Sequence, residues 1–329
     1  MEEYSIATTK EITQAKTANV KKSAYRKVNV PFGYFGSKNK IAIQLCSELP
    51  PHNCWVEAFC GSAALTLAKA PAAIEIINDK DGEIVNVFQQ LRNNHEKLCR
   101  LISLTPYSRR ELEHARSKNG NYSKLERARI FLVQSMMAIN GVFGKERGGF
   151  SYSQSYSRNG RDARVNRWYN LPERLTHVVE RLRNVRIENR DAIELLKMFI
   201  NRPASLVYLD PPYLGERTKG YTNDANDEAF HMELLKLANK AKCMIFVSGY
   251  ENKLYSKLLT KKIGWRRKII KTTTKDSKGQ SHIRNEVVWM NKHFQKAVKS
   301  GKVPIRLTDK ETKQNKLNPE RYKKRCSTK

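Results

Sequence analysis

The sequence has few cysteines, no long apolar run and few acidic side chains. No CxxC pair occurs among its six cysteines, so neither a disulfide framework nor a zinc site is indicated. No stretch approaches the roughly 20 apolar residues of a membrane span, and the start Met1-Glu2-Glu3 lacks the layout of a signal peptide. We therefore expect reduced, mostly buried thiols, no metal, no membrane association and a cytoplasmic location. The cysteines are Cys46, Cys54, Cys60, Cys99, Cys243 and Cys326.

Basic side chains, in contrast, are abundant. The 329 residues include 62 Lys and Arg against 32 Asp and Glu, which gives a formal net charge of +30. This excess is larger than solubility needs and favours a polyanionic partner, of which nucleic acid is the first candidate. The alternative is a basic protein whose charge only keeps it soluble. With 40% hydrophobic residues, the chain is able to bury a core.

The N-terminal part combines a polar arm with a glycine loop. Residues 1–24 are polar and show no sustained periodicity, which predicts a loosely ordered arm. In the next segment, Pro31-Phe-Gly-Tyr-Phe-Gly-Ser-Lys38, small residues separate aromatic rings. Apolar residues then recur at helical spacing from Ile41 to the prolines at Pro50 and Pro51, so the loop is expected to open a short helix.

A βαβ unit is predicted directly after this helix. Cys54–Phe59 has the composition of a buried strand, Gly61-Ser62 of a turn, Ala63–Ala70 of a helix and Ile74–Ile77 of a second strand. A strand, a glycine turn, a helix and a strand in this order form the nucleotide-binding unit of α/β sheets.

The rest of the chain divides into a helical insertion, a second α/β part and a tail. Residues from about 90 to 185 read as helical, as over Leu125–Met137, and then become rich in Ser, Tyr and Arg. Two late runs, Ile263–Ile270 and Glu286–Met290, predict an antiparallel hairpin that closes the sheet. Beyond Asn291 the chain has 13 Lys or Arg against 3 acids, which predicts a flexible basic tail. The α/β elements between insertion and hairpin are the strands Val185–Glu188, Leu206–Leu209 and Met244–Val247 and the helices Ala192–Ile200 and Glu228–Ala241.

The most specific motif is Leu206-Val-Tyr-Leu-Asp-Pro-Pro-Tyr213, a buried strand followed by a carboxylate, two prolines and an aromatic ring. In an open α/β sheet, ligands bind outside the carboxyl ends of the strands, so Asp210 and Tyr213 are expected in a cleft. The alternative is an ordinary strand-ending turn, because Asp and Pro both favour turns.

This motif is the last of four that occur in a fixed order. Tyr34-x-Gly-Ser-Lys38, Glu57-Ala-Phe-Cys-Gly61 and Asn78-Asp79 precede Asp210-Pro-Pro-Tyr213. Together they resemble the Dam-type family of DNA adenine methyltransferases over roughly residues 31–291. The resemblance implies an α/β, Rossmann-like methyltransferase fold with a mixed, mostly parallel sheet, a C-terminal antiparallel hairpin and an inserted, mainly helical target-recognition domain. The expected boundaries are 25–90 and 186–291 for the catalytic domain, 91–185 for the target-recognition domain and 292–329 for the tail.

The family's methyl donor is S-adenosylmethionine, a nucleoside that needs close backbone approach and an acid for its ribose hydroxyls. Gly61 meets the first need, and the resemblance implies that Asp79 binds the ribose. Lys38 is expected to pair with the cofactor carboxylate, the alternative being a solvated lysine. Asp191 is expected to approach the cofactor adenine, to cap a helix, or both. The full set expected at the cofactor is Tyr34, Lys38, Glu57, Phe59, Gly61, Asp79, Asp191, Ala192 and Asp210.

One position departs from the family pattern. Where the family usually has a further glycine in the motif after the first strand, this chain has Ala63. Because alanine is small, only a modest adjustment is expected there.

The chemistry of the amino group explains the Asp-Pro-Pro-Tyr motif. Adenine N6 is a poor nucleophile because its lone pair is delocalised into the ring. Asp210 and the carbonyl oxygen of Pro211 can each accept one N–H bond and so localise that pair during in-line attack on the methyl group. Tyr213 is expected to stack on a base flipped out of the duplex. The expected catalytic residues are therefore Asp210, Pro211, Pro212 and Tyr213, with no cysteine nucleophile.

The insertion carries the side chains that double-stranded DNA requires. Guanidinium forks and aromatic rings alternate in it, and Arg147–Phe150 resembles the family's recognition hairpin. Because most protein–DNA contacts go to the backbone, only one or two of the arginines are expected at bases, and their alternative is a solvated, phosphate-facing surface. The residues expected at DNA are Asn140, Lys145, Arg147, Tyr152, Arg158 and Arg164, and the same stretch contains Tyr156, Arg161, Arg167 and Trp168.

The sequence thus predicts a monomeric, site-specific DNA adenine-N6 methyltransferase. Two other functions stay open. The same carboxylate and carbonyl can activate an amino group of RNA or of cytosine, and a catalytically inactive homologue can still bind DNA. An intact Asp210–Tyr213 motif beside Asp79 argues against the inactive protein, since a pure DNA binder needs neither.

Overall fold

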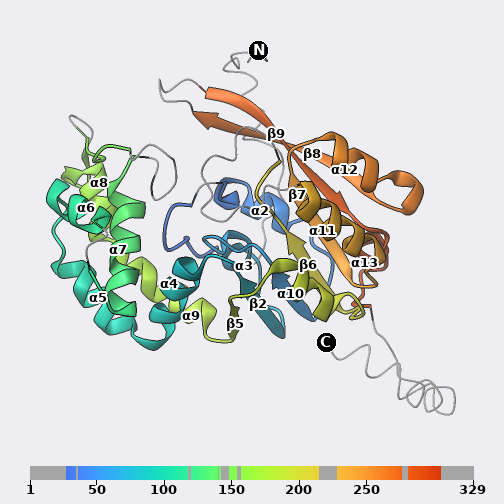
Figure 1. Ribbon diagram of the computed structural model, residues 1–329, viewed down its shortest axis with the longest axis horizontal. Coiled ribbons are helices and arrows are strands. Elements are labelled where there is room, and N and C mark those ends of the chain that lie inside the picture. The colour runs from blue at the N-terminus through green and yellow to red at the C-terminus, as the bar shows by residue number, and fades with distance from the viewer. Residues whose placement is uncertain are drawn as a thin grey trace.

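A computed structural model describes residues 27–34, 36–117, 120–139, 141, 148–153, 157–214, 228–275 and 281–304. The expected N-terminal arm and the chain beyond residue 304 lie outside the described residues. In the described part, a sheet flanked by helices lies beside a helical lobe (Figure 1). No helix of this part is long and apolar enough to cross a membrane.

The sheet has seven strands in the order β5-β2-β1-β6-β7-β9-β8. The first five are parallel, whereas β9 runs antiparallel to both β7 and β8. The expected mixed sheet and its C-terminal hairpin are thereby confirmed. The strands are β1 (Cys54–Glu57), β2 (Ile74–Asn78), β5 (Val185–Glu188), β6 (Ser205–Leu209), β7 (Met244–Gly249), β8 (Arg266–Lys275) and β9 (Ser281–Met290).

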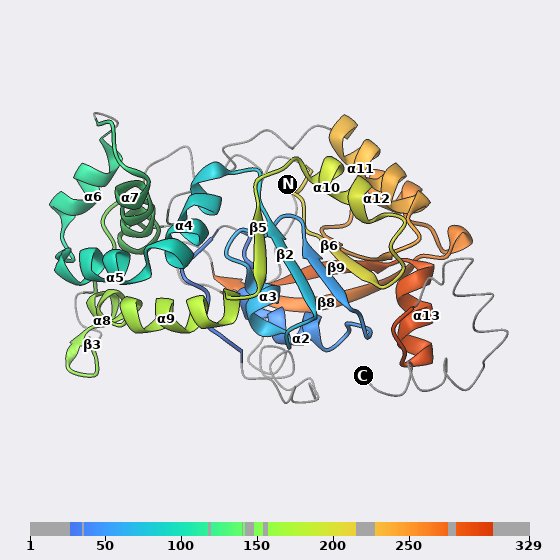
Figure 2. The same cartoon turned by 90° about the horizontal axis from the view of Figure 1, so that it is seen from below.

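Helices cover both faces of the sheet (Figure 2). One face packs against α10 (Ala192–Phe199), α11 (Glu228–Lys240) and α12 (Lys253–Leu258), with Val207 and Ile245 among the buried strand residues. The other face packs against α2 (Ala42–Cys46) and α3 (Ala64–Ala68), with Trp55 and Phe246 buried. Short 3-10 turns, Lys38–Lys40 and Lys261–Ile263, precede α2 and β8. Because both faces are covered, the central strands β1, β6 and β7 are buried and mainly apolar, whereas β5 at the edge of the sheet contains Arg186 and Glu188.

The start of the expected tail is a helix, which corrects the prediction of a flexible segment from residue 292. Helix α13 spans Lys292–Ser300 and begins at Asn291, whose side chain accepts the N–H of Phe294. Phe294 and Ala297 are each only 1% exposed, and the Phe294 ring stacks on Phe246 at 5.3 Å. The many lysines concealed the helical pattern in the sequence. Two buried residues are enough to hold this short helix against the sheet, and the rest of the helix is solvated.

The helical lobe follows β2 and returns to the sheet at β5. Its helices enclose an apolar cluster that includes Leu98, Leu132 and Leu175 and continues to Phe32 and Ile77 beside the sheet. The lobe therefore shares one core with the sheet. Its elements are α4 (Gly82–Asn93), α5 (His95–Leu104), α6 (Arg109–Arg116), α7 (Lys124–Met137), the two-stranded ribbon β3 (Ser157–Arg158) and β4 (Arg161–Asp162), α8 (Ala163–Tyr169) and α9 (Leu171–Leu182).

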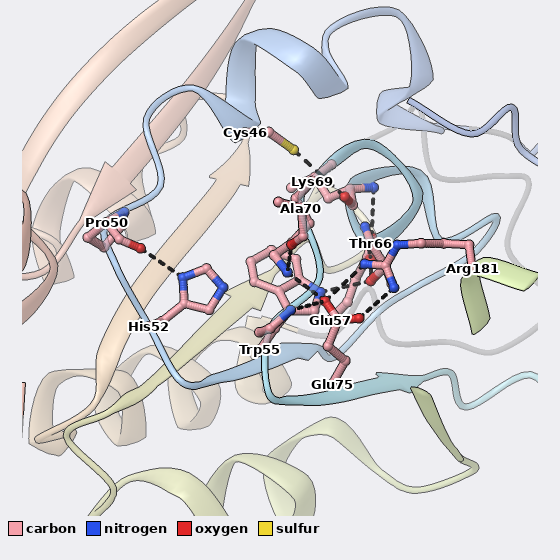
Figure 3. Close-up of polar contacts among 12 residues, drawn as sticks. Cys46, Pro50, His52, Trp55, Glu57, Thr66, Lys69, Ala70, Glu75 and Arg181 are labelled. Atoms are coloured by element: carbon pink, nitrogen blue, oxygen red, sulfur yellow. Dashed lines mark hydrogen bonds and ion pairs between the residues drawn. The ribbon is translucent and has the colours of Figure 1, made fainter. Parts of the chain in front are cut away.

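A buried ion cluster fixes the lobe to the amino ends of the strands (Figure 3). Glu75, at the start of β2, accepts hydrogen bonds from Lys69 at 2.6 Å and from both terminal nitrogens of Arg181 at 2.5 and 2.9 Å. Although burial opposes ionisation, Arg181 and Lys69 together lower the pKa of Glu75. We call Lys69, Glu75 and Arg181 the amino-edge cluster. Since Arg181 belongs to α9, the cluster joins the lobe to the first βαβ unit.

Candidate active site at the carboxyl edge of the sheet

A cavity opens at the carboxyl ends of β1, β2, β5 and β6. This position is the one at which open α/β sheets bind ligands. The nine residues expected at the cofactor all line it: Tyr34, Lys38, Glu57, Phe59, Gly61, Asp79, Asp191, Ala192 and Asp210. Sequence reasoning did not single out several other lining residues, among them Ser37, Ser62, Asp81, Arg190 and Phe230.

Asn78 joins three strand ends at the floor of this cavity. Its amide donates to the carbonyl oxygens of Ala58 and Arg190 at 2.9 and 3.1 Å and accepts the N–H of Arg190 at 2.9 Å. Asn78 is only 1% exposed. The Asn of the Asn78-Asp79 motif thus has a positioning role, while its neighbour faces the cavity.

Asp79 holds the glycine turn in place. Its carboxylate accepts the N–H groups of Gly61 at 2.8 Å and of Asp81 at 3.0 Å. Burial raises the pKa of Asp79 to about 6, although these hydrogen bonds act in the opposite direction. A carboxylate oxygen can accept two hydrogen bonds, and each oxygen of Asp79 accepts one of the two from Gly61 and Asp81. Both oxygens can therefore still accept a hydrogen bond from a ligand hydroxyl.

The turn requires glycine at position 61. Its φ of 46° lies in the left-handed region, and a Cβ there would stand 2.7 Å from Cδ1 of Tyr34. Ala63 also adopts a left-handed conformation, with φ of 55°, and is fully buried. For alanine this conformation costs about 1–2 kcal/mol, so the departure from the family glycine is taken up as local backbone strain.

Glu57 ends β1 and ties it to α3. Its carboxylate accepts the N–H of Thr66 at 2.9 Å and forms a short hydrogen bond with the Thr66 hydroxyl (Figure 3). Glu57 is 2% exposed, and burial raises its pKa to about 7. Its described contacts are therefore internal, although it also lines the cavity.

Asp191 caps a helix, as its alternative interpretation predicted. The carboxylate accepts the N–H of Ile193 at 2.9 Å at the start of α10, and its other oxygen lies 3.5 Å from the exposed Lys80 ammonium. Because Asp191 also lines the cavity, the two expectations for this residue are compatible.

Lys38 is the centre of a buried polar network. Its ammonium donates to the Gly36 carbonyl oxygen at 3.1 Å, to Asp210 at 2.8 Å and to the Tyr213 hydroxyl at 2.5 Å. The residue is 6% exposed, so the alternative of a solvated lysine is wrong. Although burial favours the neutral amine, Asp210 and Glu286 raise the pKa of Lys38 above its ordinary value.

Glu286, on β9, completes this network and was not found from the sequence. Its carboxylate accepts the Tyr213 hydroxyl at 2.9 Å and lies 3.6 Å from the Lys38 ammonium. Burial raises the pKa of Glu286 to about 7, although Lys38 opposes the shift, because one lysine cannot neutralise two carboxylates. The only sequence signal was an acid at the start of an otherwise apolar run. We call Lys38, Asp210, Tyr213 and Glu286 the carboxyl-edge cluster.

Asp210 is also held from its other oxygen. Ser248, on β7, donates to it at 2.8 Å, and the Ser248 hydroxyl is 2.6 Å from that of Tyr208. Lys38 and Ser248 therefore occupy one site on each carboxylate oxygen. The Asp210 side chain remains 15% exposed at the cavity.

The other residues of the Asp-Pro-Pro-Tyr motif divide between cavity and support. Pro212 lines the cavity together with Asp210, whereas Pro211 is buried beside it. The Tyr213 ring lies against the ring of Tyr250, with 4.4 Å between centroids. Tyr213 is thus anchored at its hydroxyl and its ring before any substrate binds.

The residues expected at DNA are only partly visible. Asn140, Lys145, Arg147 and Tyr156 lie outside the described residues. Tyr152, Arg158 and Arg164 are exposed on the lobe, and the Arg161 guanidinium lies over the Tyr169 ring at 4.2 Å. Trp168 is a correction: it is 5% exposed and donates its indole N–H to the Thr105 carbonyl oxygen, so it is a core residue.

The described base of the expected recognition hairpin is a pair of antiparallel segments. Ile139 donates its N–H to Gly149 at 2.9 Å, and Ser151 donates to Met137 at 2.7 Å. Phe150 forms an isolated antiparallel bridge with Ala138. The tip between these segments lies outside the described residues.

The strand order, the reversed last strands and the cavity at the carboxyl edge define an α/β, Rossmann-like methyltransferase. Within that class, the chain belongs to the D12 class N6 adenine-specific DNA methyltransferase family, whose model matches residues 34–303. The resemblance drawn from the four motifs is thereby confirmed. The substrate is DNA, the reaction is methylation of adenine N6, and the methyl donor is S-adenosylmethionine.

Similarity to individual proteins is distant. None of the curated proteins matches the chain. A putative methyltransferase, yhhF from Escherichia coli, has a TM-score of 0.33 and 13% identity, covering 81% of this chain and 92% of that chain. Precorrin 8w decarboxylase from Methanobacterium thermoautotrophicum has a TM-score of 0.32 and 12% identity, covering 80% and 94%.

Proposed function

We propose that the cavity at the carboxyl edge binds S-adenosylmethionine and receives an adenine flipped out of duplex DNA at a specific site. The single observation that carries this proposal is that Asp210, the acid of the catalytic motif, lines the same cavity as Gly61 and Asp79. S-adenosylmethionine supplies a methyl group made electrophilic by its sulfonium. Asp79 would hold the ribose hydroxyls, and Gly61, which lines the cavity without a side chain, would allow close approach of the cofactor to the backbone.

In this proposal, Asp210 activates the adenine amino group. Lys38 and Ser248 fix the carboxylate from behind, and each oxygen keeps a lone pair for an N–H donor. Together with the carbonyl oxygen of Pro211, Asp210 accepts both amino hydrogens and localises the nitrogen lone pair. The developing positive charge on the nitrogen is stabilised by the uncompensated negative charge of the cluster.

We assign Lys38 to Asp210 and not to the cofactor carboxylate. An ammonium has three hydrogens, and Gly36, Asp210 and Tyr213 take all three. Lys38 is therefore a positioning residue, as is Glu286, which holds Lys38 and Tyr213 from β9.

The helical lobe serves in this proposal as the target-recognition domain, corresponding to residues 91–185. Its support is the exposed arginines of α8 and the β3–β4 ribbon, together with the paired segments 137–139 and 149–151. The overall charge of +30 favours the polyanionic duplex, and the free thiols of the described cysteines fit the cytoplasm, where DNA is present.

The test is transfer of a labelled methyl group from S-adenosylmethionine to unmethylated genomic DNA, followed by mapping of the modified bases. N6-methyladenine in one short sequence, and its absence with Asp210→Ala, would support the proposal. Label in single-stranded RNA or in cytosine would contradict it, and DNA binding without any transfer would identify an inactive homologue.

A further inference from the structure

A second groove lies between the helical lobe and the sheet. Helices α8 and α9, the β3–β4 ribbon, residues 27–29 and residues 71–73 line it. Two half-buried arginines, Arg167 on α8 and Arg174 on α9, are among the lining residues. Neither was assigned to the cofactor or to catalysis, and Arg174 belongs to none of the sequence motifs.

Neither arginine has an ion-pair partner among the described residues. Arg167 makes no hydrogen bond there, and its Nη2 lies 3.5 Å from the point where a Cβ on Gly33 would stand. Arg174 makes only long contacts, at 3.5 Å to the Pro31 carbonyl oxygen and 3.8 Å to the Met136 sulfur. Its Nε is inaccessible to solvent and has no hydrogen-bond partner in this part of the chain.

Burial and neighbouring cations lower the pKa of both arginines, and the Tyr107 hydroxyl acts on Arg167 in the opposite direction. Burial and, to a smaller extent, the neighbouring Arg167 lower the pKa of Arg174 to about 10. Burial and Arg164 likewise lower the pKa of Arg167. The Asp162 carboxylate near Arg164 already accepts hydrogen bonds from the backbone N–H groups of Ser153, Arg164 and Val165, at 2.6 to 3.1 Å.

Carboxylates elsewhere in the groove do not compensate the pair. Glu75 belongs to the amino-edge cluster, where Lys69 and Arg181 already bind it. Glu173 and Glu180 are exposed on α9 and are not among the charges that shift the pKa of either arginine.

The position of the pair relates it to both functional parts of the molecule. Arg174 and Arg167 flank segment 31–34, whose last residue, Tyr34, lines the cofactor cavity. On the lobe side, Arg167 is close to Tyr107, whose hydroxyl donates to the Ser151 carbonyl oxygen at the base of the expected recognition hairpin. The pair therefore lies beside the segment that leads from the groove, at residues 27–29, to the cavity, at Tyr34.

Half-buried cations without a counter-ion cost free energy, and an anion that binds them recovers part of that cost. Guanidinium forks match the oxygens of a phosphate, and DNA, the substrate, has a phosphodiester backbone with one negative charge per phosphate. We propose that Arg167 and Arg174, assisted by Arg164, bind the DNA backbone between the bases that the lobe reads and the adenine in the cavity. This inference rests on the proposed function, because it places duplex DNA across the lobe and the cavity.

The test compares the double variant Arg167→Met/Arg174→Met with the wild-type protein in binding to a short duplex over a range of salt concentrations. Met keeps the volume and removes the charge. We expect at least a roughly tenfold loss of affinity at moderate salt and a log–log salt slope smaller by about 1 to 2. The loss should appear in the KM for DNA and not in the KM for S-adenosylmethionine.

Arg202→Met is the matched control, because Arg202 is exposed in the loop before β6 and lines neither the groove nor the cavity. It should bind DNA like the wild type. If the double variant kept the wild-type affinity and salt slope, the phosphate site would be refuted. If that variant fails to fold, the double variant Arg167→Lys/Arg174→Lys replaces it. This variant should keep the wild-type salt slope and bind DNA more weakly. An unchanged affinity would contradict the proposal.

Single methylphosphonate substitutions then locate the contact. For the wild type, affinity should fall at one or two phosphates near the target adenine, and the double variant should show no further loss at those phosphates. Uniform additivity at every phosphate would overturn the proposal. The two failures give different results. If the proposed function is wrong, the arginines still contribute to duplex binding but no methyl group is transferred. If this inference is wrong, methyl transfer occurs but binding does not depend on the arginines.

Discussion

Two buried ion clusters lie at opposite edges of the same sheet and differ in their charge balance. At the amino edge, the two cations Lys69 and Arg181 surround the single carboxylate of Glu75. At the carboxyl edge, the single cation Lys38 faces the two carboxylates of Asp210 and Glu286. The charged side chains of both clusters are of the same kinds, and all of them but Asp210 are less than 10% exposed.

This difference separates a structural cluster from a chemical one. With an excess of cations, the carboxylate of Glu75 is kept ionised, and its hydrogen bonds join the lobe to the sheet. With an excess of carboxylates, the pKa of Glu286 rises to about 7, and negative charge remains beside a cavity. A site that must accept N–H bonds and stabilise positive charge in the transition state needs the second arrangement.

The largest effect is expected from removing the charge of the acid at the cavity. In Asp210→Asn, one amino hydrogen loses its charged acceptor, so kcat should fall by about 10³-fold while S-adenosylmethionine binding changes little. Single-turnover methyl transfer and equilibrium cofactor binding measure the two quantities. A decrease of less than tenfold would assign the activation of adenine to another group.

The corresponding change at the amino edge should affect stability only. Glu75→Gln leaves Lys69 and Arg181 buried without a counter-ion, and the free energy of unfolding at pH 7 should fall by about 3 kcal/mol. Because the folded pKa of Glu75 is lowered, the wild-type advantage is present above the ordinary carboxyl pKa and disappears as the pH falls below it. Urea unfolding at neutral and acidic pH tests this, and kcat per folded molecule should not change.

Replacing the two lysines gives a matched pair. Lys38→Met removes the cation that pairs with both Asp210 and Glu286, so kcat should fall by about 10²-fold. Lys69→Met leaves Glu75 bound by both Arg181 nitrogens, so it should cost about 1–2 kcal/mol of stability and no activity. The comparison of the two edges would be wrong if both variants lost activity to the same extent.

The last expected effect is a change in the pH dependence of stability and leaves stability at low pH unchanged. The folded pKa of Glu286 is raised to about 7, so the folded state binds its proton more tightly than the unfolded state does. The resulting stability is complete below the ordinary carboxyl pKa and is lost as the pH rises through about 7. As the pH rises from 5 to 8, the free energy of unfolding of Glu286→Gln should increase by about 2 kcal/mol relative to that of the wild type. Thermal unfolding of both proteins across this range measures the difference, and parallel curves would contradict the pKa assignment.

Much of the site could be predicted from the sequence because strand ends and turn residues are local features. The apolar run before Asp210 and the glycine at position 61 each indicate their place at the carboxyl edge from neighbouring residues alone. Trp168 and the segment after Asn291 were misjudged, because a polar and basic context concealed the few side chains that are buried. The sequence pattern shows composition, whereas burial depends on what packs against each side chain.

The sequence by itself therefore determined the α/β order, the hairpin, the four motifs and the enzyme family. Only the tertiary structure decided which charges meet. Lys38, Asp210 and Glu286 are separated by 172 and 76 positions along the chain and approach one another only when β9 returns antiparallel beside β7. Arg167 and Arg174 likewise become a cationic pair without a described partner only when α8 and α9 pack beside segment 31–34. Charge–charge interactions depend on distance in space, which no local pattern of residues specifies.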